Sequence, residues 1–204
     1  ASSITGVIAD GASAAILTKA GSGTLTLSGT NTYTGQTNVN AGTLAVTVND
    51  ALGTNAAGTV IASGATLDLQ NVTYSTTEAI TNSGTLSTSI GTSSYAGTMT
   101  LDADSTIDVD GTQLTISTAI GDGSNGYAIT KDGNGTLVLS AASTFSGDLT
   151  ISAGTVTMTG TLADTVDVVN SGTYDVDTSD TIQSLSGSGN VDIATSQTLT
   201  FGDA

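Results

Sequence analysis

Apolar residues in this chain recur at every second position, in short runs separated by glycine. Leu25 and Leu27 alternate with threonine and serine, and Leu44, Val46 and Val48 repeat the pattern. The same alternation is found at Leu67/Leu69, Met99/Leu101, Ile107/Val109, Leu114/Ile116, Leu137/Leu139, Val156/Met158, Tyr174/Val176, Val191/Ile193 and Leu199/Phe201. A period of two is typical of strands with one buried face. Because no convincing helical period accompanies it, the sequence predicts an all-β fold.

The triplet Gly-Thr-apolar marks where many of these strands are expected to begin. It starts at Gly23, Gly42, Gly58, Gly84, Gly97, Gly135, Gly154, Gly160 and Gly172. We expect each glycine to turn a corner with positive φ, after which threonine faces outward and the next residue faces the core. Nine uses of one short device favour a repeated structural unit over a sandwich with individually shaped turns.

A longer repeat supports this interpretation. Residues 19–44 align without a gap on residues 131–156, with 12 identities in 26 positions. Each copy holds two Gly-Thr strand starts 19 residues apart, which suits one coil of a β-solenoid. At about 18–22 residues per coil, the chain would form a single solenoid of about ten coils over residues 1–204. The sequence leaves open whether each coil has two or three strands.

The first copy resembles a known family. Its pattern K-x-G-x-G-T-L-x-L-S-G-x-N-T-Y-x-G-x-T-x-V-x-A-G-T-L, at Lys19–Leu44, looks like the passenger-associated transport repeat of bacterial autotransporters. The second copy departs from the pattern at Ala141, at Ser143 and at 148–149. The resemblance implies a right-handed parallel β-helix that is secreted by the type V route. It also implies an extracellular location on the Gram-negative cell surface, associated with the outer membrane.

Autotransporters also carry an N-terminal signal and a C-terminal translocator. The chain opens Ala-Ser-Ser-Ile-Thr, without a basic and apolar leader, and ends without a run of barrel-type strands. We therefore expect a piece of a passenger or a mature secreted segment. Its expected partners are flanking solenoid coils or other copies of itself, together with host or matrix surfaces. No apolar run is long enough to predict a transmembrane segment.

The composition excludes several kinds of chemistry. With no His and no Cys, the chain cannot form a Ser-His-Asp triad, a thiol nucleophile or an ordinary zinc site. Lys19 and Lys131 are its only basic side chains, so we expect no nucleic-acid partner and no phosphate clamp. The sequence therefore predicts no catalytic residues and no organic cofactor.

The 18 acidic residues against two basic ones give a formal net charge of −16. Three Asp-x-Asp pairs are expected on outward strand positions: Asp102/Asp104, Asp108/Asp110 and Asp175/Asp177. Carboxylates that share a strand face could hold Ca²⁺. Neither the EF-hand loop nor the nonapeptide calcium repeat is matched, and a solvated acidic face is the favoured interpretation.

The sequence leaves three functions open. The favoured one is a non-catalytic structural and adhesive segment that presents polar solenoid faces for self-association or surface attachment. The first alternative is a calcium-dependent surface layer or fibre subunit, and the second is a carbohydrate-active β-helix enzyme that uses paired carboxylates. Outward threonines such as Thr24/Thr26, Thr98/Thr100, Thr155/Thr157/Thr159 and Thr198/Thr200 also resemble the hydroxyl arrays of ice-binding solenoids. Their spacing is too irregular to place all of them on one face.

Overall fold

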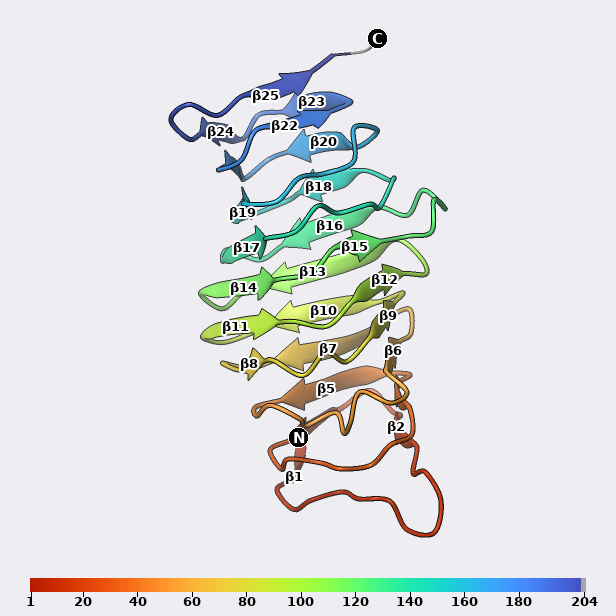
Figure 1. Cartoon of the computed structure of the whole chain (residues 1–204). Coiled ribbons are helices and arrows are strands. Elements are labelled where there is room, and N and C mark those ends of the chain that lie inside the picture. Colours follow the sequence, from red (N-terminus) through yellow and green to blue (C-terminus); the bar gives the residue numbers. More distant parts are fainter. Residues whose placement is uncertain (203–204) are drawn as a thin grey trace.

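The computed structural model describes residues 1–202, which form 25 strands. All the strand pairs are parallel, and they stack the chain into a β-solenoid of about ten turns (Figure 1). The expected all-β solenoid is therefore confirmed. Over the described part of the chain there is no helix, and hence none long and apolar enough to cross a membrane.

Most strands belong to three sheets. The ten-stranded sheet contains β1 (Ser2–Ile4), β3 (Thr24–Leu27), β5 (Gly42–Val46), β7 (Ala65–Leu69), β10 (Thr85–Thr88), β13 (Ser105–Val109), β16 (Ile129–Asp132), β18 (Leu149–Ile151), β20 (Asp167–Asn170) and β23 (Ser184–Gly187). The seven-stranded sheet contains β8 (Thr73–Tyr74), β11 (Thr92–Tyr95), β14 (Gln113–Ile116), β17 (Thr136–Leu139), β19 (Thr155–Met158), β21 (Thr173–Val176) and β24 (Asn190–Ile193). The six-stranded sheet contains β2 (Leu17–Lys19), β4 (Thr37–Val39), β6 (Thr59–Ile61), β9 (Ile80–Asn82), β12 (Met99–Leu101) and β15 (Ile120–Gly121). A fourth pair consists of β22 (Asp180–Ile182) and β25 (Leu199–Phe201).

A complete coil visits the three large sheets in turn. From β9 the chain passes to β10, then to β11, and returns to the six-stranded sheet at β12, so a complete coil has three strands. Coil length varies because the corners differ. Partner residues in successive strands are 17 positions apart at Asn170 and Gly187, and 24 positions apart at Ile107 and Lys131. This range is wider than the expected 18–22 residues.

The core is a stack of inward side chains from successive coils. Leu44, Leu67, Leu86 and Ile107 are aligned partners in the ten-stranded sheet, and all four are fully buried. Each coil thus buries its apolar residues against its two neighbours, as in other solenoids. The first and last described coils are exceptions: Val7 and Ile16 are 65% and 66% exposed, and Val191, Ile193 and Phe201 are 41%, 43% and 53% exposed. The expected burial of the last three of these residues was wrong because no further described coil covers them.

The expected corner chemistry was only partly right. Gly42, Gly58 and Gly154 do adopt positive φ angles of 64°, 75° and 67°. The other six glycines of the triplets do not, and most of them are required for a different reason. At Gly135, for example, a Cβ atom would meet the backbone of the preceding coil. Gly160 was expected to open a strand but lies in an irregular segment that replaces one.

The two 26-residue repeats lie on different faces of the solenoid. In the first copy, Lys19 ends β2 of the six-stranded sheet and the chain continues into the ten-stranded sheet. In the second copy, Lys131 belongs to the ten-stranded sheet and the chain continues into the seven-stranded sheet. In each copy an irregular segment with a buried aromatic residue, Tyr33 or Phe145, replaces the third strand. The repeat therefore specifies a corner and its neighbours, not a particular face.

Candidate functional site

The six aspartates proposed as calcium ligands do not form one site. Asp102 and Asp104 lie in the turn between β12 and β13, not on a strand as expected, and both are exposed. The side chain of Asp104 accepts a hydrogen bond from the backbone N–H of Ala128 at 2.9 Å. A turn suits short polar residues because their side chains can bond to nearby backbone groups. The spacing of this pair is therefore explained by corner geometry.

The other two pairs lie on different sheets. Asp108 is in β13, whereas Asp110 follows this strand at the corner. Asp175 is in β21, on the outer face of the seven-stranded sheet, where its Oδ2 accepts a hydrogen bond from the Thr157 hydroxyl at 3.0 Å. Asp177 follows β21 and is exposed. Only Asp108 and Asp175 thus occupy the expected outward strand positions.

The closest approach to a carboxylate cluster is at Asp108. This residue is the aligned partner of Asp132 in the next coil. Burial raises the pKa of Asp108, and the carboxylates of Asp110 and Asp132 raise it further, while Lys131 opposes them. Among residues 1–202, no three Asp, Glu, His or Cys side chains gather in an arrangement that could hold a metal ion. Calcium binding stays an untested hypothesis.

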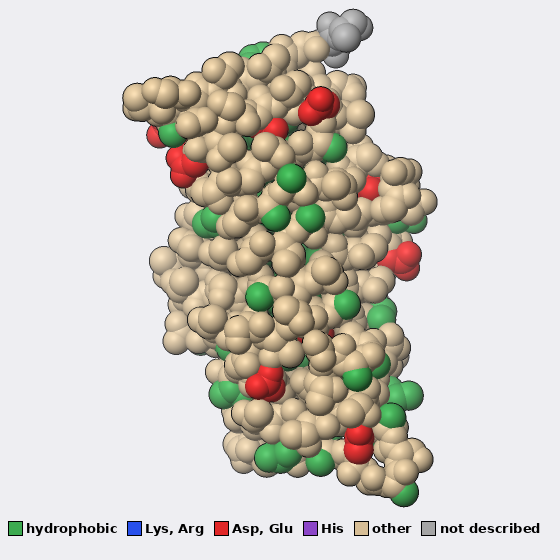
Figure 2. Space-filling model, viewed as in Figure 1, with side chains coloured by type: hydrophobic (Ala, Val, Ile, Leu, Met, Phe, Trp, Pro, Cys, Tyr) green, Lys and Arg blue, Asp and Glu red, His purple; other side chains and the backbone are tan. Residues whose placement is uncertain are grey.

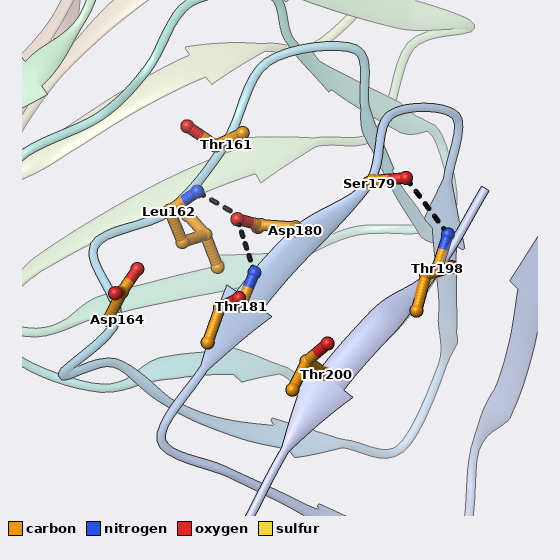
Figure 3. Close-up of a pocket in the computed structure, with 8 residues that line it drawn as sticks. All are labelled: Thr161, Leu162, Asp164, Ser179, Asp180, Thr181, Thr198 and Thr200. Atoms are coloured by element: carbon orange, nitrogen blue, oxygen red, sulfur yellow. Dashed lines mark hydrogen bonds between the residues drawn. The ribbon is translucent and has the colours of Figure 1, made fainter.

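A groove of about 320 Å³ lies near the last coils (Figure 3). It is lined by Thr161, Leu162, Asp164, Ser179, Asp180, Thr181, Thr198 and Thr200. Asp180 is its buried carboxylate, and it accepts hydrogen bonds from the backbone N–H groups of Leu162 at 3.0 Å and Thr181 at 2.9 Å. Burial raises the pKa of Asp180, and these two bonds counter only part of that rise. The groove offers threonine and serine hydroxyl groups to a polar ligand. Its buried carboxylate, Asp180, is already hydrogen-bonded to two backbone N–H groups of the protein.

Both lysines are structural corner residues. The Lys131 side chain is fully buried, and its Nζ donates hydrogen bonds to the carbonyl oxygens of Asp132 at 2.7 Å, Gly133 at 2.8 Å and Ala153 at 3.2 Å. Lys19 makes the equivalent three bonds to Ala20, Gly21 and Ala41. Each ammonium group thus joins its own turn to the corner of the next coil. The sequence contains a signal for this shared structural role, because the two lysines occupy the same position in the two repeats.

Asp122 holds the glycine-rich loop at 121–127 in place. Its carboxylate accepts hydrogen bonds from the backbone N–H groups of Ser124, Gly126, Tyr127 and Ser146, and from the Ser146 hydroxyl. Burial raises the pKa of Asp122, but the bonds from Ser146, Ser124 and Tyr127 outweigh this effect and keep it below 3.8. An ionised carboxylate surrounded by N–H donors stabilises a loop of this kind.

We expect the Asp122→Asn variant to lose about 2 kcal/mol of stability, because the amide presents donors to a site built from donors. The effect should be local, with faster hydrogen exchange at residues 121–127 and 146. Because folding lowers the pKa of Asp122, its contribution is present above pH 3.8 and is lost in stronger acid. Asp148→Asn, which changes an exposed carboxylate nearby, is the matched control. Equal exchange in the two variants would contradict this role.

A ladder of threonines runs along the outer face of the ten-stranded sheet. Strand register aligns Thr24, Thr43, Thr66, Thr85, Thr106, Thr130 and Thr150, one from each of seven successive coils. We call these seven residues the threonine ladder. Neighbouring parallel strands are about 4.8 Å apart, so the hydroxyl groups recur at about this interval. All seven side chains are half-buried in the strand surface.

The pattern along single strands does not reveal this ladder. The threonines paired along one strand lie on different faces, as expected: Thr24 is in the ten-stranded sheet, Thr100 in the six-stranded sheet and Thr155 in the seven-stranded sheet. The ladder instead takes one threonine from each coil, at intervals that vary with coil length. Figure 2 shows a surface made mostly of backbone and neutral polar groups, with separate carboxylates between them.

Comparisons with known proteins agree with this geometry. The family model of the passenger-associated transport repeat matches residues 17–46 and 129–158, which contain both lysine corners. The chain carries the transport repeats of an autotransporter passenger. A curated relative, the adhesin BmaC autotransporter of Brucella suis biovar 1 (strain 1330), is 35% identical over 153 residues. This match covers 74% of the chain but only 4% of the relative. No solved structure matches the chain significantly.

The two matched repeats explain how this passenger segment is built. Each one contains a buried lysine corner and a buried aromatic residue, at Lys19 and Tyr33 or at Lys131 and Phe145. Between the repeats, the chain keeps the same coil without the lysine. At the corresponding corner, Asn82 accepts a hydrogen bond from the Gly84 N–H at 3.0 Å. The passenger fold thus tolerates different polar groups at one kind of corner.

Proposed function

We propose that this passenger segment is a non-catalytic structural and adhesive part of a secreted protein on the Gram-negative cell surface. Its polar faces would associate with other copies of the segment or attach to host or matrix surfaces. The threonine ladder is the single observation that carries this proposal. The similarity to an adhesin autotransporter supports the same assignment.

A regular ladder suits adhesion because it repeats one weak contact many times. A single hydrogen bond contributes a net stabilisation of only about 0.5–1.5 kcal/mol. When seven hydroxyl groups lie on one rigid face, however, the contacts form together and their effects combine. The strands that carry the ladder are held by the core, so little conformational entropy is lost on contact.

The first experiment measures sedimentation of the segment at several concentrations, with about 2 mM Ca²⁺ or with a chelator. The test variant changes Thr66, Thr85 and Thr106 to valine, which keeps the branched shape and removes three adjacent ladder hydroxyls. The control makes the same change at Thr136, Thr155 and Thr173, which are aligned in the seven-stranded sheet. We expect only the first variant to weaken association or surface attachment, by at least about tenfold.

The outcomes separate the remaining functions. Equal weakening by both variants, or by neither, would contradict the specific role of the ladder. Association only with Ca²⁺ would favour a calcium-dependent layer or fibre. Asp108 and its aligned partner Asp132 would then be the first residues to substitute. Hydrolysis of a polysaccharide that is lost in Asp180→Asn would favour a carbohydrate-active enzyme. A rigid monomer that attaches to no surface would leave the segment as a spacer.

A further inference from the structure

The only glutamate of the chain, Glu78, is buried in the N-terminal half of the solenoid. It lies between β8 and β9, where the chain turns from the seven-stranded to the six-stranded sheet. The side chain is 1% exposed. Its Oε1 accepts a hydrogen bond from the Thr59 hydroxyl at 2.7 Å, whereas its Oε2 has no hydrogen-bond partner among the described residues. A buried oxygen in this state is costly, above all when it carries charge.

Three buried tyrosines surround this corner. The Tyr33 hydroxyl is 2.6 Å from the Thr37 hydroxyl, and the Tyr74 hydroxyl accepts a hydrogen bond from the Leu52 N–H at 3.1 Å. The Tyr95 hydroxyl donates to the backbone carbonyl of Glu78 itself. The Tyr74 and Tyr95 ring centroids are 6.3 Å apart. We call Tyr33, Thr59, Tyr74, Glu78 and Tyr95 the Glu78 corner.

The groups that face Glu78 offer little stabilisation of a negative charge. From the irregular segment after β3, from β8 and from β11 it meets the phenols Tyr33, Tyr74 and Tyr95, and from β6 it meets Thr59. Burial raises the pKa of Tyr33 to about 12 and raises those of Tyr74 and Tyr95 as well, so all three stay neutral. Asp50, whose carboxylate accepts a hydrogen bond from the Thr76 hydroxyl, raises the pKa of Tyr74 by its negative charge.

We propose that Glu78 makes the packing of this corner depend on pH: the corner is closed while the carboxyl group is neutral, and segments 47–58 and 75–79 open locally when it ionises. The segments concerned are irregular and replace or follow strands of the seven-stranded sheet. Such segments open more readily than a continuous ladder, because fewer backbone hydrogen bonds hold them. The other coils keep their own neighbours and stay folded.

The sign of the effect follows from the direction of the pKa shift. Burial raises the pKa of Glu78 from 4.5 to about 7, although the Thr59 bond opposes this rise. Between pH 4.5 and about pH 7, the Glu78 carboxyl group therefore keeps its proton in the closed corner and loses it in the open corner. The stability of the closed corner is greatest below pH 4.5, falls as the pH rises through about 7, and is constant above that range.

A direct test uses the fact that the chain has one glutamate. Selective ¹³C labelling of the glutamate carboxyl carbon yields a single resonance, whose titration from pH 4 to 9 we expect to have its midpoint well above the usual value of about 4.3. Thr59→Val removes the bond that favours the charged form, so it should move the midpoint further upward. A wild-type midpoint at the usual glutamate value would overturn the proposal without any variant.

Hydrogen exchange tests the opening itself. After correction for intrinsic rates, exchange in segments 47–58 and 75–79 should rise at least about tenfold between pH 5 and pH 8. In Glu78→Gln this rise should disappear, while exchange in residues 129–158 stays as in the wild type. Asp148→Asn, which removes an exposed carboxylate elsewhere, should keep the wild-type response. The same pH dependence in Glu78→Gln as in the wild type would overturn the proposal.

Discussion

Replacing Lys131 with methionine is expected to destabilise the solenoid by about 3 kcal/mol, one of the two largest effects that we predict. The methionine side chain fills similar space but leaves the carbonyl oxygens of Asp132, Gly133 and Ala153 without the ammonium donor. Hydrogen bonds to a charged group contribute more than neutral ones, and here three of them join two coils. Urea unfolding followed by circular dichroism measures the loss.

The cost of burying the Lys131 ammonium group limits the expected loss of stability. Burial lowers the pKa of Lys131, which means that the folded protein carries a cost for keeping this ammonium group away from water. Asp108, Asp132 and Asp110 counter part of that cost by their charge. An apolar residue avoids the cost, and replacements of buried charges are sometimes neutral for this reason. A methionine variant as stable as the wild type would show that the desolvation cost cancels the three bonds.

Lys19→Met is the matched comparison. Lys19 makes the same three bonds, but it lies in the first complete corner and is 5% exposed. Val7 and Ile16, in the coil before Lys19, are 65% and 66% exposed, so this coil is loosely packed and local opening already exposes the bonds to water. We therefore expect a loss of less than half that of Lys131→Met. Equal losses of stability in the two variants would indicate that the contribution of the lysine corner does not depend on how tightly the neighbouring coils pack.

The second large effect is expected at Gly135, which occupies the same position in the second repeat as Gly23 in the first. An alanine methyl group at 135 would lie 2.8 Å from both the carbonyl oxygen and Cγ1 of Val109, and closer still to the Gly111 carbonyl oxygen. The two coils would have to separate, so we expect Gly135→Ala to cost about 3 kcal/mol. Thermal and urea unfolding measure the difference from the wild type.

Gly23→Ala is the control for this prediction, and it should have the opposite sign. No atom lies within 4 Å of a Cβ placed at Gly23, and its φ is outside the left-handed region. Alanine there reduces the freedom of the unfolded chain and should stabilise by about 0.4–1 kcal/mol. If both variants lost equal stability, the effect would come from the repeat motif itself and not from the coil that lies beneath it.

The fold class was readable from the chain because strand period and turn chemistry are local properties. Leu137 and Leu139, or Val156 and Met158, are buried wherever their strand lies in the stack. Their recurrence at every second position was therefore a sound basis for predicting strands. Gly160 shows the limit, since it begins the same triplet as Gly154 but opens an irregular segment. The triplet is compatible with a strand, while the neighbouring coil decides whether one forms.

The candidate site was predicted less well. The Asp-x-Asp spacing suggested shared faces, but Asp102 and Asp104 occupy a turn and Asp110 and Asp177 lie beyond the ends of their strands. The importance of Glu78 could not be seen either, because nothing beside it in the chain marks it as buried. Its surroundings come from Tyr33, Thr59 and Tyr95, which lie in other coils.

By itself, the sequence determined that this chain forms stacked coils of short strands and carries two transport repeats. These features depend on residues close together in the chain. Only the tertiary structure decided which side chains stack across coils: the threonine ladder, the closed Glu78 corner, and the placement of the two repeats on different faces. The reason is that coil length varies from 17 to 24 residues. The residue that pairs with a given side chain in the next coil depends on the length of that coil, and only the folded stack shows this length.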